Sequence, residues 1–131
     1  MDIRDNYIRD ARVTSVYDGD TITAMVSLGY DQYRRNKFRF KGVNTAEMRG
    51  STGARLQLAK DAKAYVESKV LDKDVRILSE RFELDGYGRY LATIYYNENG
   101  EWINLNEDLL AKGLAQTYYP GASKDFGEWH K

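Results

Sequence analysis

The chain has 131 residues, of which 42% are hydrophobic and 31% are charged. This length suits one domain with its own apolar core and is too short for two, so we expect a single domain over residues 1–131. Twenty basic and twenty acidic residues give a net charge of zero. Attraction to nucleic acid must therefore come from local basic patches, because there is no overall positive field. The absence of cysteine excludes disulfides and thiolate metal sites.

The sequence carries no sign of export or of membrane insertion. Residues 1–5 lack the apolar stretch of a signal peptide, and no apolar run approaches the length of a membrane span. We therefore expect a cytoplasmic protein without a membrane partner, or a secreted one if a leader has been removed. No feature of the sequence requires an oligomer.

The first half of the chain has the alternating pattern of strands, from residue 12 to residue 43. Apolar residues at 22, 24, 26 and 28 alternate with residues 21, 23, 25 and 27, which predicts one buried and one solvated face. Turn signals lie at Asp18-Gly19 and Gly29. Phe38 and Phe40 share one face, so Arg39 must project from the other. This makes Arg39 a candidate for a groove or a site.

The second half predicts two helices and two strands. Ser51 and Thr52 can cap a helix to about residue 71, whose buried face would hold residues 58, 59, 62, 65, 66, 69 and 70. Strands are expected over 74–84 and 89–96, a turn over 97–100, and a helix over 104–112 closed by Gly113. The tail can hold one more helical turn. Five strands with a helix between the third and fourth predict a mainly β (α+β) protein, an OB-type Greek-key barrel with two to three helices.

A few charged residues carry the chemistry that the sequence can support. Carboxylates at 18 and 20 can hold a hard cation, and arginines at 39 and 89 can clamp a phosphate. Together with the Thr45-Ala46-Glu47 corner, these are the parts needed to hydrolyse a phosphodiester. Each feature alone also fits an ordinary turn, a glycine-rich loop or a surface ion pair. The combination favours a phosphodiesterase.

Four segments, in one order across about residues 11–119, resemble the staphylococcal nuclease (thermonuclease) family. They are residues 16–21 (VYDGDT), 38–47 (FRFKGVNTAE), 85–92 (DGYGRYLA) and 110–115 (LAKGLA). The resemblance implies an OB-like barrel with helices and an endonuclease that cleaves DNA and RNA, single-stranded or locally unwound. It also implies a Ca²⁺ cofactor, with Mg²⁺ or Mn²⁺ as alternatives.

The resemblance also implies roles for individual residues. Asp20 matches the principal metal carboxylate, with Asp18 close to it outside the direct ligands. The metal site would be completed by Asn44 and the backbone carbonyl of Thr45. Glu47 matches the carboxylate that orients or deprotonates the attacking water. The two phosphate-binding arginines correspond to residues 39 and 89.

Aromatic positions that border the nucleotide in the family match Tyr87 and Tyr119, where a ring can stack on a base. With 11 tyrosines in the chain, a packing role for either is an equal alternative. His130 lies almost at the end of the chain, and we assign it no role.

Two departures from the family pattern leave two functions open. Asn44 replaces a second metal carboxylate, which predicts weaker calcium binding, and Ala46 replaces a proline that would stiffen the corner carrying Glu47. The sequence predicts a metal-dependent nuclease with reduced metal affinity or a changed ion preference. The alternative is a non-catalytic nucleic-acid-binding or protein-binding module on the same barrel, which Asn44 and the zero net charge favour.

Overall fold

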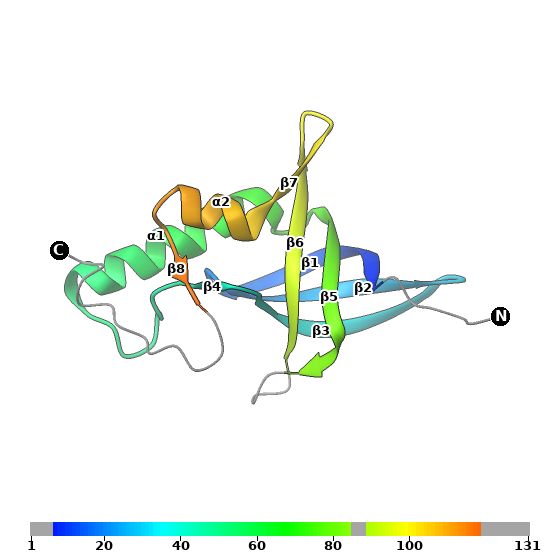
Figure 1. The fold of residues 1–131 in the computed structure, drawn as a ribbon, viewed down its shortest axis with the longest axis horizontal. Coiled ribbons are helices and arrows are strands. Elements are labelled where there is room, and N and C mark those ends of the chain that lie inside the picture. The colour runs from blue at the N-terminus through cyan, green and yellow to red at the C-terminus, as the bar shows by residue number, and fades with distance from the viewer. Residues whose placement is uncertain (1–6, 85–88, 119–131) are drawn as a thin grey trace.

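The computed structural model of the chain describes residues 7–84 and 89–118. Its main sheet has six strands in the order β3-β2-β1-β5-β6-β7. Their bounds are β1 Ile8–Asp18, β2 Thr21–Gly29, β3 Gln32–Phe40, β5 Asp74–Leu84, β6 Tyr90–Glu98 and β7 Glu101–Asn104. Parallel pairing of β3 with β6 closes all of these strands except β7 into a barrel (Figure 1). The predicted mainly β fold with a five-stranded OB-type barrel is confirmed.

The rest of the described chain forms two helices and a small second sheet. Helix α1 covers Gly53–Val70 and helix α2 covers Leu105–Ala111. The short strands β4 (Val43–Asn44) and β8 (Gln116–Thr117) pair beside them, on one side of the barrel (Figure 1). The helical turn expected in the tail lies outside the described residues. No helix in the described part is long and apolar enough to cross a membrane.

The barrel interior is the apolar core. Ile22, Ala24 and Val26 of β2 point into it as predicted, and Phe38 and Phe40 of β3 join them. The prediction is wrong for Leu28, which is 48% exposed. The reason is that β1 pairs with β2 only as far as Val26, so the end of the β2–β3 hairpin projects past the barrel (Figure 1).

Helix α1 packs one apolar stripe against the barrel. Its buried residues are Ala59, Ala62, Val66 and Val70, at the three- and four-residue spacing of a helix face. The other residues predicted for this face, at 58, 65 and 69, are only partly buried. Thr52 is the N-cap residue, as the sequence indicated, but its side chain makes no capping hydrogen bond. Packing of the apolar stripe therefore contributes more to this helix than its cap does.

Besides Leu105 and Leu109, which pack into the core, helix α2 contacts the barrel through the buried polar side chain of Asn106. Its Oδ1 accepts from the Ile94 N–H at 3.1 Å, and its Nδ2 donates to the carbonyls of Ala92 at 3.1 Å and Lys41 at 2.9 Å. Because all of these hydrogen bonds are buried or partly buried, their loss would leave polar groups unsatisfied. Asn106 thus ties α2, β6 and the turn after β3 together.

Strand β7 was not predicted from the sequence, although the turn before it was. Asn99 and Gly100 have positive φ angles of 55° and 88°, as a two-residue hairpin with a primed turn requires. The chain therefore returns along β6 for four residues before α2 begins. This added strand carries Trp102 onto the outer face of the sheet.

Candidate active site

The closure of the barrel brings the candidate residues of distant segments together. Thr21 of β2 pairs with Arg39 of β3, and Arg39 pairs on its other side with Leu91 of β6. Arg89, immediately before β6, is thereby placed next to Thr21, and its Nη1 donates to the Thr21 hydroxyl at 3.2 Å. The two arginines, 50 positions apart in the chain, thus both lie close to Thr21 at the start of β2.

A cleft of about 810 Å³ opens at this end of the barrel. It is lined by Ser15, Val16, Tyr17, Asp18, Asp20, Thr21, Thr23, Lys37, Arg39, Glu47, Arg49 and Arg89. Five of the residues singled out from the sequence, at 18, 20, 39, 47 and 89, therefore share one cleft. Asn44 and Thr45 do not line it, because both are buried behind it.

The guanidinium of Arg39 is buried and held from several sides. Its Nη1 donates to the carbonyls of Phe40 at 3.1 Å and Val43 at 2.8 Å, and its Nη2 donates to Asn44 Oδ1 at 2.9 Å. Nη1 also lies 3.4 Å from Asp20 Oδ2. A guanidinium carries five N–H donors, so donors remain for a phosphate at the cleft. The neutral amide of Asn44 thus serves to orient Arg39.

The two carboxylates of the β1–β2 turn hold the backbone corner that carries Glu47. Asp20 Oδ2 accepts from the Thr45 N–H at 3.0 Å, and Asp18 Oδ1 accepts from the Met48 N–H at 3.3 Å. Glu47 lies between these two anchored residues and is exposed at the cleft. Two hydrogen bonds to carboxylates thus restrain this corner, in which Ala46 is fully buried.

Burial raises the pKa of Asp18 above its ordinary value, because the ionised form loses contact with water. Repulsion from Asp20 and Glu47 adds to this effect, whereas the Met48 N–H and the positive charge of Lys63 oppose it. The Asp18 carboxylate is therefore held in an unfavourable environment at neutral pH. Such a pKa shift in a cleft is typical of functional sites, although structural clusters show it as well.

Gly19, between the two carboxylates, lies in close contact with helix α1. A Cβ atom at this position would lie 2.7 Å from the Ala62 Cβ and 3.0 Å from the Thr45 Cγ2. Real Cβ atoms do not approach that closely, so only glycine fits. The Asp18-Gly19-Asp20 segment is therefore a point where the barrel, α1 and the Thr45 corner meet, and not a solvated turn.

Sequence reasoning assigned no role to Thr21, Lys37 or Arg49, which also line the cleft. The Thr21 hydroxyl donates to Asp20 Oδ1 at 3.0 Å and accepts from Arg89, so it links the acidic turn to the second arginine. Strand periodicity could have indicated Lys37, which lies two residues before Arg39 on the same face. No local signal indicates the link through Thr21, because it depends on the pairing of β3 with β6.

The two tyrosines proposed from the resemblance, Tyr87 and Tyr119, lie outside the described residues, as does His130. The neighbouring Tyr118 is described, and its ring lies 5.6 Å from the Arg39 Cζ. This distance is within the range of a cation–π contact. An aromatic ring therefore covers part of the buried guanidinium.

Oxygen donors of the kind that a hard cation prefers lie at the cleft and in the buried layer behind it. Among the described residues, no three His, Cys, Asp or Glu side chains form a ready-made metal cluster. Asp18 and Asp20 contribute carboxylates at the cleft. Behind it lie the Asn44 amide oxygen, which accepts from Arg39, and the Thr45 hydroxyl, a buried oxygen with no hydrogen-bond partner in the described part of the chain. An all-oxygen set is the kind that Ca²⁺, Mg²⁺ and Mn²⁺ prefer.

The fold and this cleft define a small OB-type barrel protein with arginines and carboxylates at one end of the barrel. A domain-family model described as staphylococcal nuclease homologue matches residues 37–129. The chain belongs to this family, as its sequence motifs predicted. An uncharacterized protein of Methanocaldococcus jannaschii is 30% identical to it over 132 aligned positions, which cover 90% of this chain and 62% of that protein. The chain thus spans less than two thirds of the length of this relative.

Proposed function

We propose that the protein is a metal-dependent nuclease that hydrolyses phosphodiester bonds of DNA and RNA. The observation that carries this proposal is the placement of Asp20, Arg39, Glu47 and Arg89 around one cleft. Membership of the staphylococcal nuclease homologue family supports a nucleic-acid substrate. The cleft is lined by four cationic side chains, at 37, 39, 49 and 89, and by three carboxylates, at 18, 20 and 47. It can therefore hold an anion next to acidic groups.

The two arginines would bind the scissile phosphate from two sides. Arg39 is fixed by backbone carbonyls and by Asn44, and Arg89 is positioned by the Thr21 hydroxyl. Negative charge builds on the phosphate oxygens as the attacking oxygen approaches phosphorus. Fixed guanidiniums bind this charge more strongly in the transition state than in the substrate, and this difference accelerates the reaction.

Glu47 would act on the attacking water. It is exposed at the cleft on a corner that Asp18 and Asp20 restrain, so its carboxylate is accessible and its backbone is held in place. As general base, Glu47 takes a proton from water, the water oxygen bonds to phosphorus, and the bond to the leaving oxygen breaks. The leaving oxygen then takes a proton from solvent.

Asp20, Asn44 and the Thr45 carbonyl would hold the metal, with Asp18 close by. A bound Ca²⁺ supplies positive charge against the phosphate, and Mg²⁺ or Mn²⁺ could supply the same. Because Asn44 is neutral, one negative charge is missing compared with a site that has a carboxylate there. We therefore propose a reduced affinity for calcium or a changed ion preference.

A plasmid-nicking assay with Ca²⁺, Mg²⁺ and Mn²⁺, repeated on a labelled RNA strand, tests this proposal. We expect cleavage with at least one ion and a loss of about 10²–10⁴-fold in kcat for Glu47→Gln, with substrate binding largely kept. Glu101→Gln, an exposed glutamate of β7 outside the cleft, is the matched control and should cleave at the wild-type rate. Absence of cleavage with every ion would remove the proposal.

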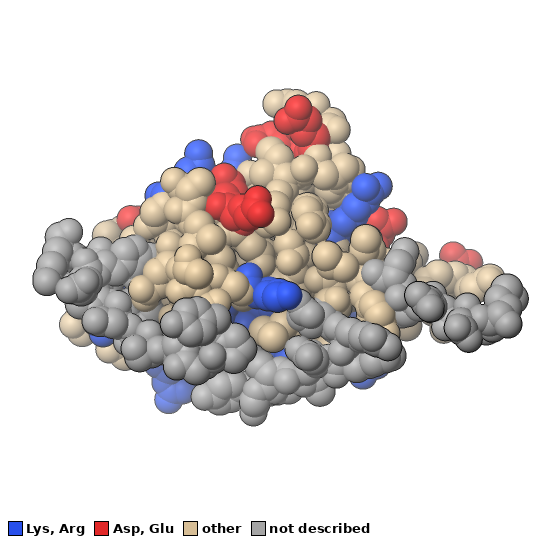
Figure 2. All heavy atoms as spheres, in the orientation of Figure 1, with Lys and Arg blue, Asp and Glu red and all other residues tan. Residues whose placement is uncertain are grey.

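A non-catalytic nucleic-acid-binding or protein-binding module is the second candidate. It is favoured by Asn44 and by the charge distribution: Figure 2 shows acidic and basic side chains interspersed on one face, without a large surface of one sign. This candidate predicts binding of single strands that neither chelation nor Glu47→Gln changes, and no turnover. We prefer the nuclease because a binding surface has no need of Glu47 on a restrained corner beside two arginines.

A further inference from the structure

We propose that the outer face of β2 and β3 is an extended binding track for single-stranded nucleic acid that leads away from the cleft. The proposal rests on the nuclease function proposed above, because the track would lead a substrate strand to the cleft in which cleavage takes place. The track begins at Lys37 and Arg39, which line the cleft, and continues along residues outside the candidate active site. Its occupant is a single strand several nucleotides long.

A row of side chains runs along the outer face of β3. Tyr33, Arg35, Lys37 and Arg39 occupy alternate positions of this strand, so all four lie on one face, opposite to the core residues Phe38 and Phe40. Lys37 and Arg39 line the cleft, and Tyr33 lines a second hollow further along the strand. From Arg39 to Tyr33 the row spans six residues, or about 20 Å.

Strand β2 provides the surface beside this row. Residues 21, 23, 25 and 27 pair in turn with residues 39, 37, 35 and 33. Thr23 belongs to the cleft, and Met25, two positions along on the same face, belongs to the second hollow. The cleft and the hollow are therefore consecutive parts of one sheet face.

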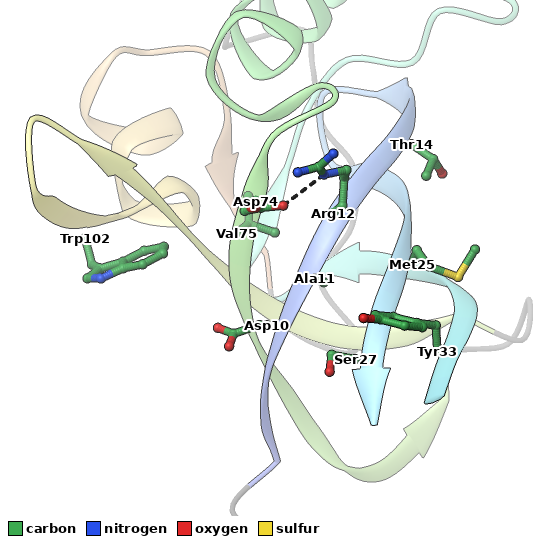
Figure 3. Close-up of a pocket in the computed structure, with 10 residues that line it drawn as sticks. All are labelled: Asp10, Ala11, Arg12, Thr14, Met25, Ser27, Tyr33, Asp74, Val75 and Trp102. Atoms are coloured by element: carbon green, nitrogen blue, oxygen red, sulfur yellow. Dashed lines mark hydrogen bonds and ion pairs between the residues drawn. The ribbon is translucent and has the colours of Figure 1, made fainter. Parts of the chain in front are cut away.

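The second hollow, which has a volume of about 840 Å³, is bordered by two aromatic side chains, Tyr33 and Trp102. Figure 3 shows Tyr33 next to Met25 at one side of the hollow. Trp102 lies at the opposite side, across β1 and β5. Tyr33 is 63% exposed and Trp102 is 39% exposed. Arg76 lies over the Trp102 ring, with its Cζ 4.2 Å from the ring centroid. Exposed rings of this kind are stacking surfaces for unpaired bases.

The charges around the hollow indicate how a strand would lie. On its β5 side the cations are paired, Arg12 with Asp74 at 2.9 Å and Arg76 with Asp10 at 3.6 Å. On β3, Arg35 and Lys37 are exposed, and among the side chains that the structure describes, those of residues 7–79 and 89–118, neither has a carboxylate partner. Phosphates would therefore follow β3, and bases would turn toward the aromatic rings.

Fluorescence anisotropy with a labelled 12-residue oligothymidylate in EDTA tests the track in the absence of turnover. We expect Tyr33→Ala to weaken binding about five- to tenfold. Arg35→Ala should weaken it similarly and reduce the slope of log K against log salt concentration by about 0.7, the value for one lost phosphate contact to a single strand. Tyr30→Ala is the aromatic control, since Tyr30 is 98% exposed and lines neither hollow. Lys60→Ala on α1 is the charge control.

Wild-type affinity in both Tyr33→Ala and Arg35→Ala would overturn the proposal of a binding track. A lack of binding by the wild-type protein would also overturn it and would assign this face to another partner. In the presence of an ion that supports cleavage, both variants should have a lower kcat/KM than the wild-type protein on the 12-residue strand and an unchanged kcat/KM on a thymidine dinucleotide. Equal losses of kcat/KM on both substrates would also overturn the proposal. If no ion supports cleavage but the variants still bind more weakly than the controls, the nuclease proposal fails and the track stands.

Discussion

The backbone N–H of Thr45 donates to the side chain of Asp20 at 3.0 Å, across 25 positions of the sequence. The same carboxylate oxygen lies 3.4 Å from Arg39 Nη1. Asp20 thus positions one arginine and the corner that carries Glu47, in addition to being the main candidate ligand for a metal. Replacing Asp20 would disturb all three at once, so other residues are better probes of the individual roles.

Asn44→Asp should tighten calcium binding. The substitution adds one negative charge next to Asp20, and a charge pair near 4 Å is worth about 1 kcal/mol in water and about 4 kcal/mol near a protein surface, so we expect roughly a tenfold gain or more. Isothermal titration calorimetry measures the affinity. Asn97→Asp, an exposed position outside the cleft, should leave it unchanged. An unchanged affinity in Asn44→Asp would contradict the assignment of this residue to the metal site.

Gly19→Ala should destabilise the protein through contact with helix α1. The new Cβ would lie 2.7 Å from the Ala62 Cβ, and overpacking of this kind costs about 1–3 kcal/mol. Urea unfolding measures the change. Ala62→Gly alone should cost about 1 kcal/mol through its effect on the helix, but it should partly rescue Gly19→Ala in the double variant. Strict additivity of the two single changes would show that this contact does not limit stability.

Thr21→Val should reduce turnover more than it reduces stability. Valine keeps the shape of the buried side chain but loses the hydroxyl that joins Asp20 to Arg89. We expect kcat to fall roughly tenfold, the equivalent of about 1.4 kcal/mol, with a small change in KM. Thr21→Ser retains the hydroxyl and should restore most of the rate. A valine variant with wild-type kcat would show that Thr21 does not position Arg89.

Asp18→Asn should stabilise the metal-free protein in a pH-dependent way. The pKa of Asp18 is raised in the folded state, mainly by burial, above the unfolded value of about 3.9. At a pH between these two pKa values, the folded state binds more protons than the unfolded state. The contribution of Asp18 to stability is therefore fully present below the unfolded pKa and is lost as the pH rises through the folded pKa. Asparagine avoids this loss and can still accept from the Met48 N–H.

Thermal unfolding in EDTA at pH 7 and pH 3 measures this effect. The variant should have a higher Tm than the wild-type protein at pH 7, and the two should have equal Tm values at pH 3. A gain of the same size at both pH values would contradict the explanation by ionisation and would indicate a packing effect.

Much of the fold follows from local patterns. The alternation in β2 and β3 predicted which side chains face the core, and it placed Arg39 on the opposite face, where the structure has it. The helical spacing predicted α1 and its buried stripe, and Asn99-Gly100 predicted a turn. These predictions succeed because the repeat of a strand or a helix is a property of consecutive residues. Leu28 is one exception, since its exposure depends on where β1 stops pairing with β2.

The site required the three-dimensional structure. Sequence patterns identified charged residues that suit phosphodiester chemistry, but the pairing of β3 with β6 places Arg89 beside Thr21. The fit of Gly19 against Ala62 and the row from Arg39 to the hollow at Tyr33 likewise depend on segments far apart in the chain. A local repeat encodes which way a side chain points from its own backbone. It cannot encode what lies opposite, because contacts between distant segments arise only when the whole barrel closes.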